Sequence, residues 1–386
     1  MLPVKHIRLL YLINEVKTET KLMLLFMKKK LHRFLSLLLQ SVAFWTIALF
    51  CYGMFRYFGI EQEIGVTMLK GFEGGAVFIW PLVILTSVGL GLGVLYALID
   101  FLFEKYVSKN ISLGFNIAYK IGLYLMATVL TLTAFGSIAS HFILVNVQFK
   151  FGWWLHEKRF WSLLFFLFVS SIVYSFVKIA IERFGSGTFI KILMGSYKIP
   201  KEENRIFMFL DLRDSTTIAE QLGHQKYSQF IQDCFFDLNE VILNHDAEIY
   251  QYVGDEAVLS WPYKKGLANN NCLGVFFAFQ QQQELRKAYY MEKYSIYPEF
   301  KAGLHGGTLM VAEVGSVKKE LAYHGDVINT SARIQAKCNT FEVSLLISEK
   351  LLKDLHIDEF SISKSLGNIL LKGKREKVNL YAVERS

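Results

Sequence analysis

Four uninterrupted apolar stretches constrain the fold of this 386-residue chain more than any other feature. They cover residues 34–55, 76–99, 121–147 and 160–177, and His141 is the one ionisable residue within them. An α-helix needs roughly 20 apolar residues to cross the hydrocarbon core of a bilayer. We therefore expect a membrane domain with four transmembrane helices at 33–182, preceded by a basic cytoplasmic segment at 1–32.

The distribution of charge predicts the orientation. Residues 1–203 carry 21 Lys and Arg against 11 Asp and Glu, whereas residues 204–386 carry 21 against 23. Eight basic residues precede the first apolar stretch, which places the N-terminus in the cytoplasm by the positive-inside rule. Four crossings return the chain to that side, so both termini are expected in the cytoplasm of an inner (plasma) membrane protein. Because the basic excess lies in the apolar half, it indicates membrane topology and no nucleic-acid partner.

The apolar stretches hold few ionisable residues, which disfavours a transporter or channel. The four cysteines (Cys51, Cys234, Cys272 and Cys338) show no metal-binding spacing. We interpret them as ordinary thiols in a reducing compartment.

The C-terminal half, 204–386, has the pattern of a soluble α+β domain. Residues 206–210 form a short apolar run typical of a buried strand, and residues 248–261 read as a hairpin that turns at Gly254-Asp255. Further strands are expected at 300–311, 321–324 and 361–383, and helices at 215–223, 227–243, 267–289 and 326–338. Interleaved hairpins and helices favour an α+β sheet over a doubly wound parallel one.

Two carboxylates stand at the ends of predicted strands. Asp211 follows the run 206–210, and Asp255 occupies the hairpin turn. If these strands are neighbours, both side chains project from one edge of the sheet, where they could hold a divalent cation. The alternative is a helix N-cap aspartate and a turn aspartate with no metal.

Five segments of this half resemble the class III nucleotidyl cyclases, in the order and spacing of that family. They are Phe209-Leu-Asp-Leu-Arg-Asp-Ser-Thr216, Tyr252-Val-Gly-Asp-Glu256, Ala302-Gly-Leu-His-Gly-Gly307, Tyr323-His-Gly-Asp-Val-Ile-Asn-Thr-Ser-Ala-Arg333, and Leu371-Lys-Gly373 with Leu380-Tyr381. The resemblance spans nearly all of 204–386 and implies a ferredoxin-like βαββαβ core in a membrane-anchored, bacterial-type form with a single catalytic domain.

The resemblance implies a role for each matching residue. Asp211, Asp255 and the Leu212 carbonyl would bind two Mg²⁺ or Mn²⁺ ions, which activate the ribose 3′-hydroxyl of ATP and neutralise its triphosphate. Asn329 would orient the ribose, and Arg333 would stabilise charge growing on the α-phosphate. The phosphates would also contact Ser215 and Thr216, which lie at a helix start, and Lys372. Each site of this family combines two subunits, which implies a homodimer.

The expected purine contacts depart from the family pattern. Adenylate-specific members usually carry Lys and Asp or Thr at the positions that Gln251 and Ala322 occupy here, and guanylate-specific members usually carry Glu and Cys. The Gln251 amide can both donate and accept, so it could pair with either purine. Neither guanine-type residue is present, which favours ATP.

These features predict a membrane-bound adenylate cyclase, in which a coupling linker at 183–203 joins the membrane domain to the catalytic domain. The membrane helices would hold the dimer together and are candidates for sensing an unknown ligand. The alternatives are a guanylate cyclase, a non-catalytic cyclase-like regulatory or sensor dimer, and a transporter with a regulatory domain.

Overall fold

The chain divides into two compact units, 1–184 and 185–386, which are described separately. The computed structural model describes residue 31 and residues 34–56, 79–107, 111–142, 152–156, 158–184, 186–355 and 361–385. The predicted basic segment at 1–32 lies almost wholly outside the described residues, as do the loop after the first span and the end of the third predicted span.

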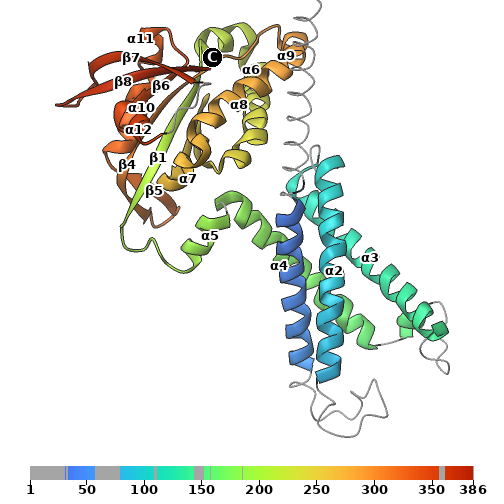
Figure 1. Cartoon of the computed structure of the whole chain (residues 1–386). Coiled ribbons are helices and arrows are strands. Elements are labelled where there is room, and N and C mark those ends of the chain that lie inside the picture. The colour runs from blue at the N-terminus through green and yellow to red at the C-terminus, as the bar shows by residue number, and fades with distance from the viewer. Residues whose placement is uncertain are drawn as a thin grey trace, which may run out of the picture. The chain divides into compact units, whose positions relative to one another are not determined.

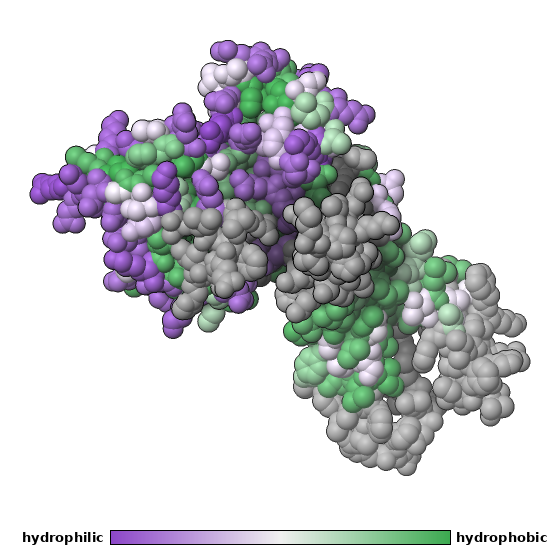
Figure 2. Space-filling view, turned by 45° about the horizontal axis from the view of Figure 1, so that its top comes forward, coloured by the Kyte–Doolittle hydropathy of each residue, from purple (hydrophilic) through white to green (hydrophobic). Residues whose placement is uncertain are grey.

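Among its described residues, the first unit has four helices that are long and apolar enough to cross a membrane, as the sequence predicted: Phe34–Arg56, Leu82–Phe103, Leu113–Ala134 and Phe160–Ile181. The last three belong to the helices α2 (Ile79–Tyr106), α3 (Leu113–Phe142) and α4 (Lys158–Phe184) (Figure 1). A short 3₁₀ helix, Trp153–His156, precedes α4. Figure 2 shows hydrophobic residues over the surface of these helices, and large side chains such as Phe165 and Phe176 are exposed there. This exposure is consistent with a lipid environment.

A buried polar cluster joins three of these helices. Asp100 of α2 is 1% exposed and accepts hydrogen bonds from the hydroxyls of Tyr124 and Tyr174. Its carboxylate also lies 3.0 Å from the Lys178 ammonium of α4 and 3.6 Å from that of Lys120 of α3. Asp100 and Lys178 lie just beyond the apolar stretches 76–99 and 160–177, yet both are inside the helix bundle, where each neutralises the charge of the other.

The second unit is built on an eight-stranded mixed sheet. Seven strands follow the order β2-β3-β1-β4-β6-β8-β7, and β5 pairs with β4. Their bounds are β1 Lys201–Leu212, β2 Glu248–Val253, β3 Glu256–Pro262, β4 Phe300–Val314, β5 Glu320–His324, β6 Leu345–Ser348, β7 Ser361–Leu370 and β8 Lys377–Arg385. The antiparallel order β4-β1-β3-β2 is the expected ferredoxin-like core, and β4 and β6 form a parallel pair.

Helices cover both faces of this sheet. One face packs against α6 (Ser215–Ile242), α8 (Asn271–Leu285) and α9 (Lys287–Tyr294), where Phe230, Phe276 and Tyr290 are fully buried. The other face packs against α10 (Asp326–Gln335) through Val327 and Ile334. The shorter helices are α5 Ser186–Leu193, α7 Tyr263–Leu267, α11 Cys338–Phe341, α12 Glu349–Asp354 and the 3₁₀ turns Leu243–His245 and Ala268–Asn270. Burial of each large apolar side chain stabilises the fold by about 1.5–3 kcal/mol.

The predicted elements of this unit are present, with differences at a glycine and at two asparagines. The two helices expected at 215–223 and 227–243 form one element, α6, which is interrupted at Gly223 by a non-helical conformation (φ 69°). The single helix expected at 267–289 is broken into separate short helices, because Asn269 and Asn270 adopt positive φ. Within the predicted linker, α5 begins at Ser186 and β1 at Lys201; its coupling role stays a prediction.

Candidate active site

Asp211 lies near the C-terminal end of β1, on the face of the sheet that α10 covers. Its direct partners across the sheet are Glu256 of β3 and Lys301 of β4. The Lys301 ammonium lies 3.2 Å from Asp211 Oδ2, and the Gln335 amide of α10 donates to the same oxygen at 2.9 Å. Burial raises the pKa of Asp211, as does the charge of Asp255, whereas Lys301 and Gln335 lower it. The carboxylate is thus fixed in place by two neighbouring elements.

Asp255 lies in the turn between β2 and β3, next to this carboxylate. Gly254 adopts a positive φ of 62°, which a two-residue hairpin turn requires. Burial and the charges of Asp211 and Asp255 raise the pKa of Glu256 to about 7. Three carboxyl groups therefore repel one another at this edge of the sheet. The metal-binding role expected of Asp211 and Asp255 stays a prediction.

This concentration of carboxylates fits a divalent cation, which binds hard oxygen ligands and would relieve the repulsion. In the described part of the chain, no group of three or more His, Cys, Asp or Glu side chains is placed to hold a metal ion alone. A cation at Asp211 and Asp255 would therefore take further ligands from outside this side-chain set, as Mg²⁺ does when it binds water and substrate phosphates.

The helix α10 presents the two predicted catalytic side chains. Asn329 is exposed and Arg333 is half-buried. They lie one turn apart on the same side of the helix. The Arg333 guanidinium lies against Gly373, in the turn between β7 and β8, where an added Cβ would be 3.4 Å from its Nη2. The helix itself rests directly on β4: a Cβ at Gly303 would lie 2.2 Å from the Gln335 backbone nitrogen.

The predicted metal ligand Leu212 and the predicted phosphate contacts occupy two separate segments, residues 212–216 and the β7–β8 turn. Leu212 ends β1 and is 1% exposed. Ser215 and Thr216 begin α6, whose N-terminal amides are suited to anions. Lys372 is exposed in the β7–β8 turn, and its neighbour Lys374 instead bonds Asp326 at 2.6 Å.

The two predicted purine positions lie on strands that approach each other. Gln251 of β2 is exposed and follows a register shift between Ile249 and Gln251, while Ala322 of β5 is half-buried. Their neighbours Tyr250 and Tyr323 contact each other with ring centroids 4.9 Å apart. The structure therefore brings β2 and β5 together, although neither strand pairs with the other in the sheet.

Sequence reasoning missed Lys301, Gln335 and Glu256 as members of this site. Gln335 lies two residues beyond Arg333, where the fourth cyclase-like segment ends, and Lys301 precedes the segment that begins at Ala302. The alternation of β4 could have placed Lys301 beside Asp211 had the pairing of β4 with β1 been known.

Comparison with known proteins is consistent with this geometry. Residues 198–385 match the family described as "Adenylate and Guanylate cyclase catalytic domain". "Adenylate cyclase 2" of Rhizobium meliloti (strain 1021) is 34% identical over 262 residues, which cover 64% of this chain and 72% of that protein. "Adenylate cyclase 1" of the same organism is 26% identical over 180 residues, which cover 46% of this chain and 27% of that protein. A solved bacterial light-regulated adenylyl cyclase has the same fold, with a TM-score of 0.50 and 16% identity over 60% of this chain and 67% of that chain.

Proposed function

The chain belongs to the family of adenylate and guanylate cyclases, and on this premise we propose that it is a membrane-bound adenylate cyclase that converts ATP to 3′,5′-cyclic AMP and pyrophosphate. The observation that carries the proposal is the edge at which β1 and the β2–β3 turn bring Asp211 and Asp255 together beside α10. The name of the relative that is 34% identical supports ATP as the substrate.

The residues of this chain divide the chemistry between them. Asp211, Asp255 and the Leu212 carbonyl would hold two Mg²⁺ or Mn²⁺ ions, and these, when bound, lower the pKa of the ribose 3′-hydroxyl and neutralise phosphate charge. Asn329 orients the ribose so that its 3′-oxygen faces the α-phosphorus. The Arg333 guanidinium stabilises the charge that grows on the α-phosphate as pyrophosphate leaves.

Other side chains position the substrate. The start of α6, with Ser215 and Thr216, and Lys372 bind phosphate oxygens. Gln251 faces the purine edge, where its amide donates to adenine N1 and accepts from the 6-amino group, and Ala322 leaves the second usual contact unfilled. One neutral bidentate contact discriminates by about 1–3 kcal/mol, so the preference for ATP over GTP should be modest.

The site requires a second copy of the chain. Asn329 is exposed on α10, and in this family it acts on substrate held by the metal-binding residues of the partner subunit. We place the catalytic unit of this homodimer in the cytoplasm, since the basic segment before the first span favours that orientation. The membrane is then the inner (plasma) membrane, with an unidentified ligand as the signal that the helices would receive.

The test is cyclic nucleotide formation by the purified full-length protein in lipid, with ATP or GTP and with Mg²⁺ or Mn²⁺. Formation of cyclic AMP with a higher kcat/KM for ATP supports the proposal. A higher kcat/KM for GTP would make the protein a guanylate cyclase. Turnover of neither nucleotide, by a protein shown to be folded and dimeric, would favour a non-catalytic regulatory or sensor dimer.

The purine assignment has its own test in the double variant Gln251→Lys/Ala322→Asp. It restores the usual adenine-reading pair and should sharpen the preference for ATP by about tenfold or more, as one additional bidentate contact would. An unchanged ratio would show that other residues read the base.

A further inference from the structure

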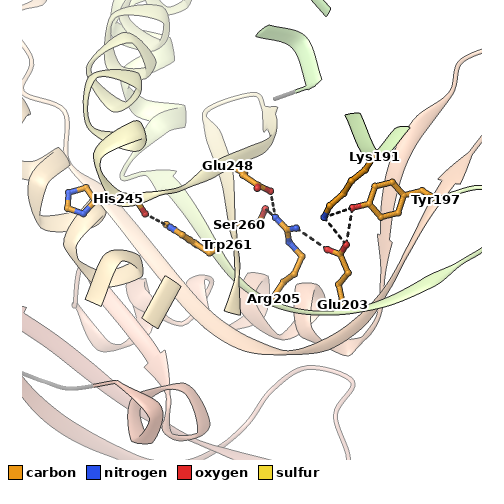
Figure 3. Close-up of polar contacts among 8 residues, drawn as sticks. All are labelled: Lys191, Tyr197, Glu203, Arg205, His245, Glu248, Ser260 and Trp261. Atoms are coloured by element: carbon orange, nitrogen blue, oxygen red, sulfur yellow. Dashed lines mark hydrogen bonds and ion pairs between the residues drawn. The ribbon is translucent and has the colours of Figure 1, made fainter. Parts of the chain in front are cut away.

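Arg205 is a buried charge of the second unit with several polar partners, and the proposed mechanism does not use it. It lies on β1, six residues before Asp211, and is 2% exposed. Its guanidinium donates to Glu203 at 3.1 Å, to Ser260 of β3 at 2.9 Å and to Glu248 of β2. Figure 3 shows it between the two carboxylates. A guanidinium that donates from both terminal nitrogens to β1, β2 and β3 ties these three strands together at one point.

The same guanidinium also contacts the strand that carries the second purine position. It lies over the ring of Tyr323 of β5, 5.1 Å from the ring centroid. Tyr323 in turn contacts Tyr250 of β2, with centroids 4.9 Å apart, and Phe207 of β1, with centroids 5.2 Å apart. Arg205 therefore holds β2 through Glu248 and β5 through Tyr323.

These contacts lie next to the two purine positions. Tyr323 is the neighbour of Ala322, and Tyr250 is the neighbour of Gln251. The register of β2 shifts between Ile249 and Gln251, so Tyr250, two residues after Glu248, is the unpaired position. A bulge of this kind re-aims the side chains that follow it. The anchor at Glu248 therefore lies two residues before the bulge, and Gln251 directly follows the bulge.

On its other side, the network reaches the predicted coupling linker, 183–203. The Tyr197 hydroxyl donates to Glu203 at 2.9 Å, and the Lys191 ammonium lies 3.2 Å from that hydroxyl and 3.5 Å from Glu203. Tyr197 is 3% exposed, and its carbonyl accepts from the Glu313 backbone amide of β4 at 2.9 Å. Lys191 belongs to α5. Glu203 consequently shares its carboxylate between the linker and Arg205 (Figure 3).

We propose that Arg205 is a positioning residue of the cyclase: it fixes the separation of β2 and β5, and so the purine-reading positions 251 and 322, and Glu203 and Tyr197 make this setting depend on the position of the linker. The inference rests on the proposed function, since it assigns the regulation of the same site. A displacement of α5 would withdraw Tyr197 from Glu203, change how Glu203 binds Arg205, and alter nucleotide affinity rather than the chemical step.

The first test compares Arg205→Lys, Glu248→Gln and the matched control Glu202→Gln in the full-length protein, with kcat and KM measured for ATP and GTP. Lys keeps the charge but lacks the guanidinium fork. Glu202 is an exposed carboxylate on the same strand. We expect the first two variants to raise KM for ATP and to change the ATP-to-GTP ratio of kcat/KM by about threefold or more, with kcat within about twofold, as loss of ground-state positioning requires. The control should match the wild type.

The outcomes separate this inference from the proposed function. A wild-type protein without cyclase activity refutes the proposed function. If the wild type is active but Arg205→Lys and Glu248→Gln keep its KM and its ATP-to-GTP ratio of kcat/KM, the positioning role alone is refuted. A loss of kcat and of thermal stability with KM unchanged refutes it as well. If Arg205→Lys does not fold, Glu248→Gln still decides the question, because its carboxylate is 41% exposed and the amide is isosteric.

The second test is a double-mutant cycle between the linker and β2. Tyr197→Phe removes one hydroxyl, and Glu248→Gln removes one charge. The two residues are connected by hydrogen bonds through Glu203 and Arg205. We expect their effects on kcat/KM to be non-additive by about threefold or more, because residues in one hydrogen-bonded network are energetically coupled. Effects that multiply independently would overturn the connection from the linker to the purine site.

Discussion

A single methyl group at Gly303 should displace the helix that carries Asn329 and Arg333. Gly303 lies on β4 where α10 crosses it, and an alanine Cβ there would stand 2.2 Å from the Gln335 backbone nitrogen and 2.6 Å from its Cα. Both atoms are backbone, so no side-chain rotation relieves the clash. Since ordinary contacts begin near 3.4 Å, α10 must retreat by about 1 Å.

Two effects follow from this displacement. Overpacking of this kind lowers the free energy of unfolding by about 1–3 kcal/mol. In a domain of this size, a cost near the middle of that range lowers Tm by roughly 4–8 °C. A misplacement of about 1 Å at the reacting groups can lower turnover about 10²-fold. The Gln335 amide also moves with the helix and weakens its 2.9 Å bond to Asp211.

The assay measures kcat for cyclic AMP formation at a temperature well below the Tm of both proteins, so that unfolding does not contribute. Gly307→Ala is the matched control on the same strand: its Cβ would meet only side-chain atoms, Val327 Cγ2 at 3.1 Å and Lys350 Nζ at 3.2 Å. Its effect should be much smaller. A Gly303→Ala protein with kcat within about threefold of wild type would refute the link between this packing and α10-based catalysis.

Three further results are expected. Asp255→Asn should lower turnover about 10²-fold or more without changing Tm by more than a few degrees, because it removes a charged metal ligand from a surface turn; near-normal activity at saturating Mn²⁺ would contradict the metal assignment. Asp211→Ala and Arg333→Ala chains, each inactive alone, should regain partial activity when mixed, whereas confirmed hetero-dimers that stay inactive would argue for sites within one chain. Burial and nearby lysines lower the pKa of His305 to about 4, so between about 6.5 and 4 the unfolded state binds a proton that the folded state does not, and stability falls as pH falls. The decrease in Tm from pH 7 to 5 should be smaller in His305→Gln than in the wild type, and parallel decreases would show that His305 is not responsible.

Local sequence patterns predicted most helices and strands of this chain, because a buried element carries apolar residues either at a regular spacing or in a continuous run. The apolar run before Asp211 became β1, and Gly254-Asp255 formed the hairpin turn. Helix ends in the membrane unit were harder to place. Asp100 and Lys178 interrupt apolar runs, yet α2 and α4 continue through them, because the two charges neutralise each other across a distance of 78 positions.

The contacts that complete the candidate site depend on pairings that no local pattern encodes. Lys301 reaches Asp211 only because β4 pairs antiparallel with β1 in one register, and Gln335 reaches it only because Gly303 lets α10 approach the sheet. The resemblance to the cyclase motifs identified the residues expected to contact the substrate. The side chains that hold those residues in place could be identified only from the packing in the structure. Arg205 belongs to this second class.

The cluster around Asp100 limits how the membrane helices can move. Removing one partner from a buried ion pair typically costs about 3–5 kcal/mol, and a slide of α4 by one helical turn, about 5.4 Å, would separate Lys178 from the carboxylate that it now contacts at 3.0 Å. A piston stroke of α4 alone is therefore opposed at the level of Asp100. Tilting or rotating α2, α3 and α4 as one body keeps all of these contacts. We therefore expect a conformational change in this unit to reorient α2, α3 and α4 together as a rigid body. We do not expect α4 to slide along its own axis relative to α2 and α3.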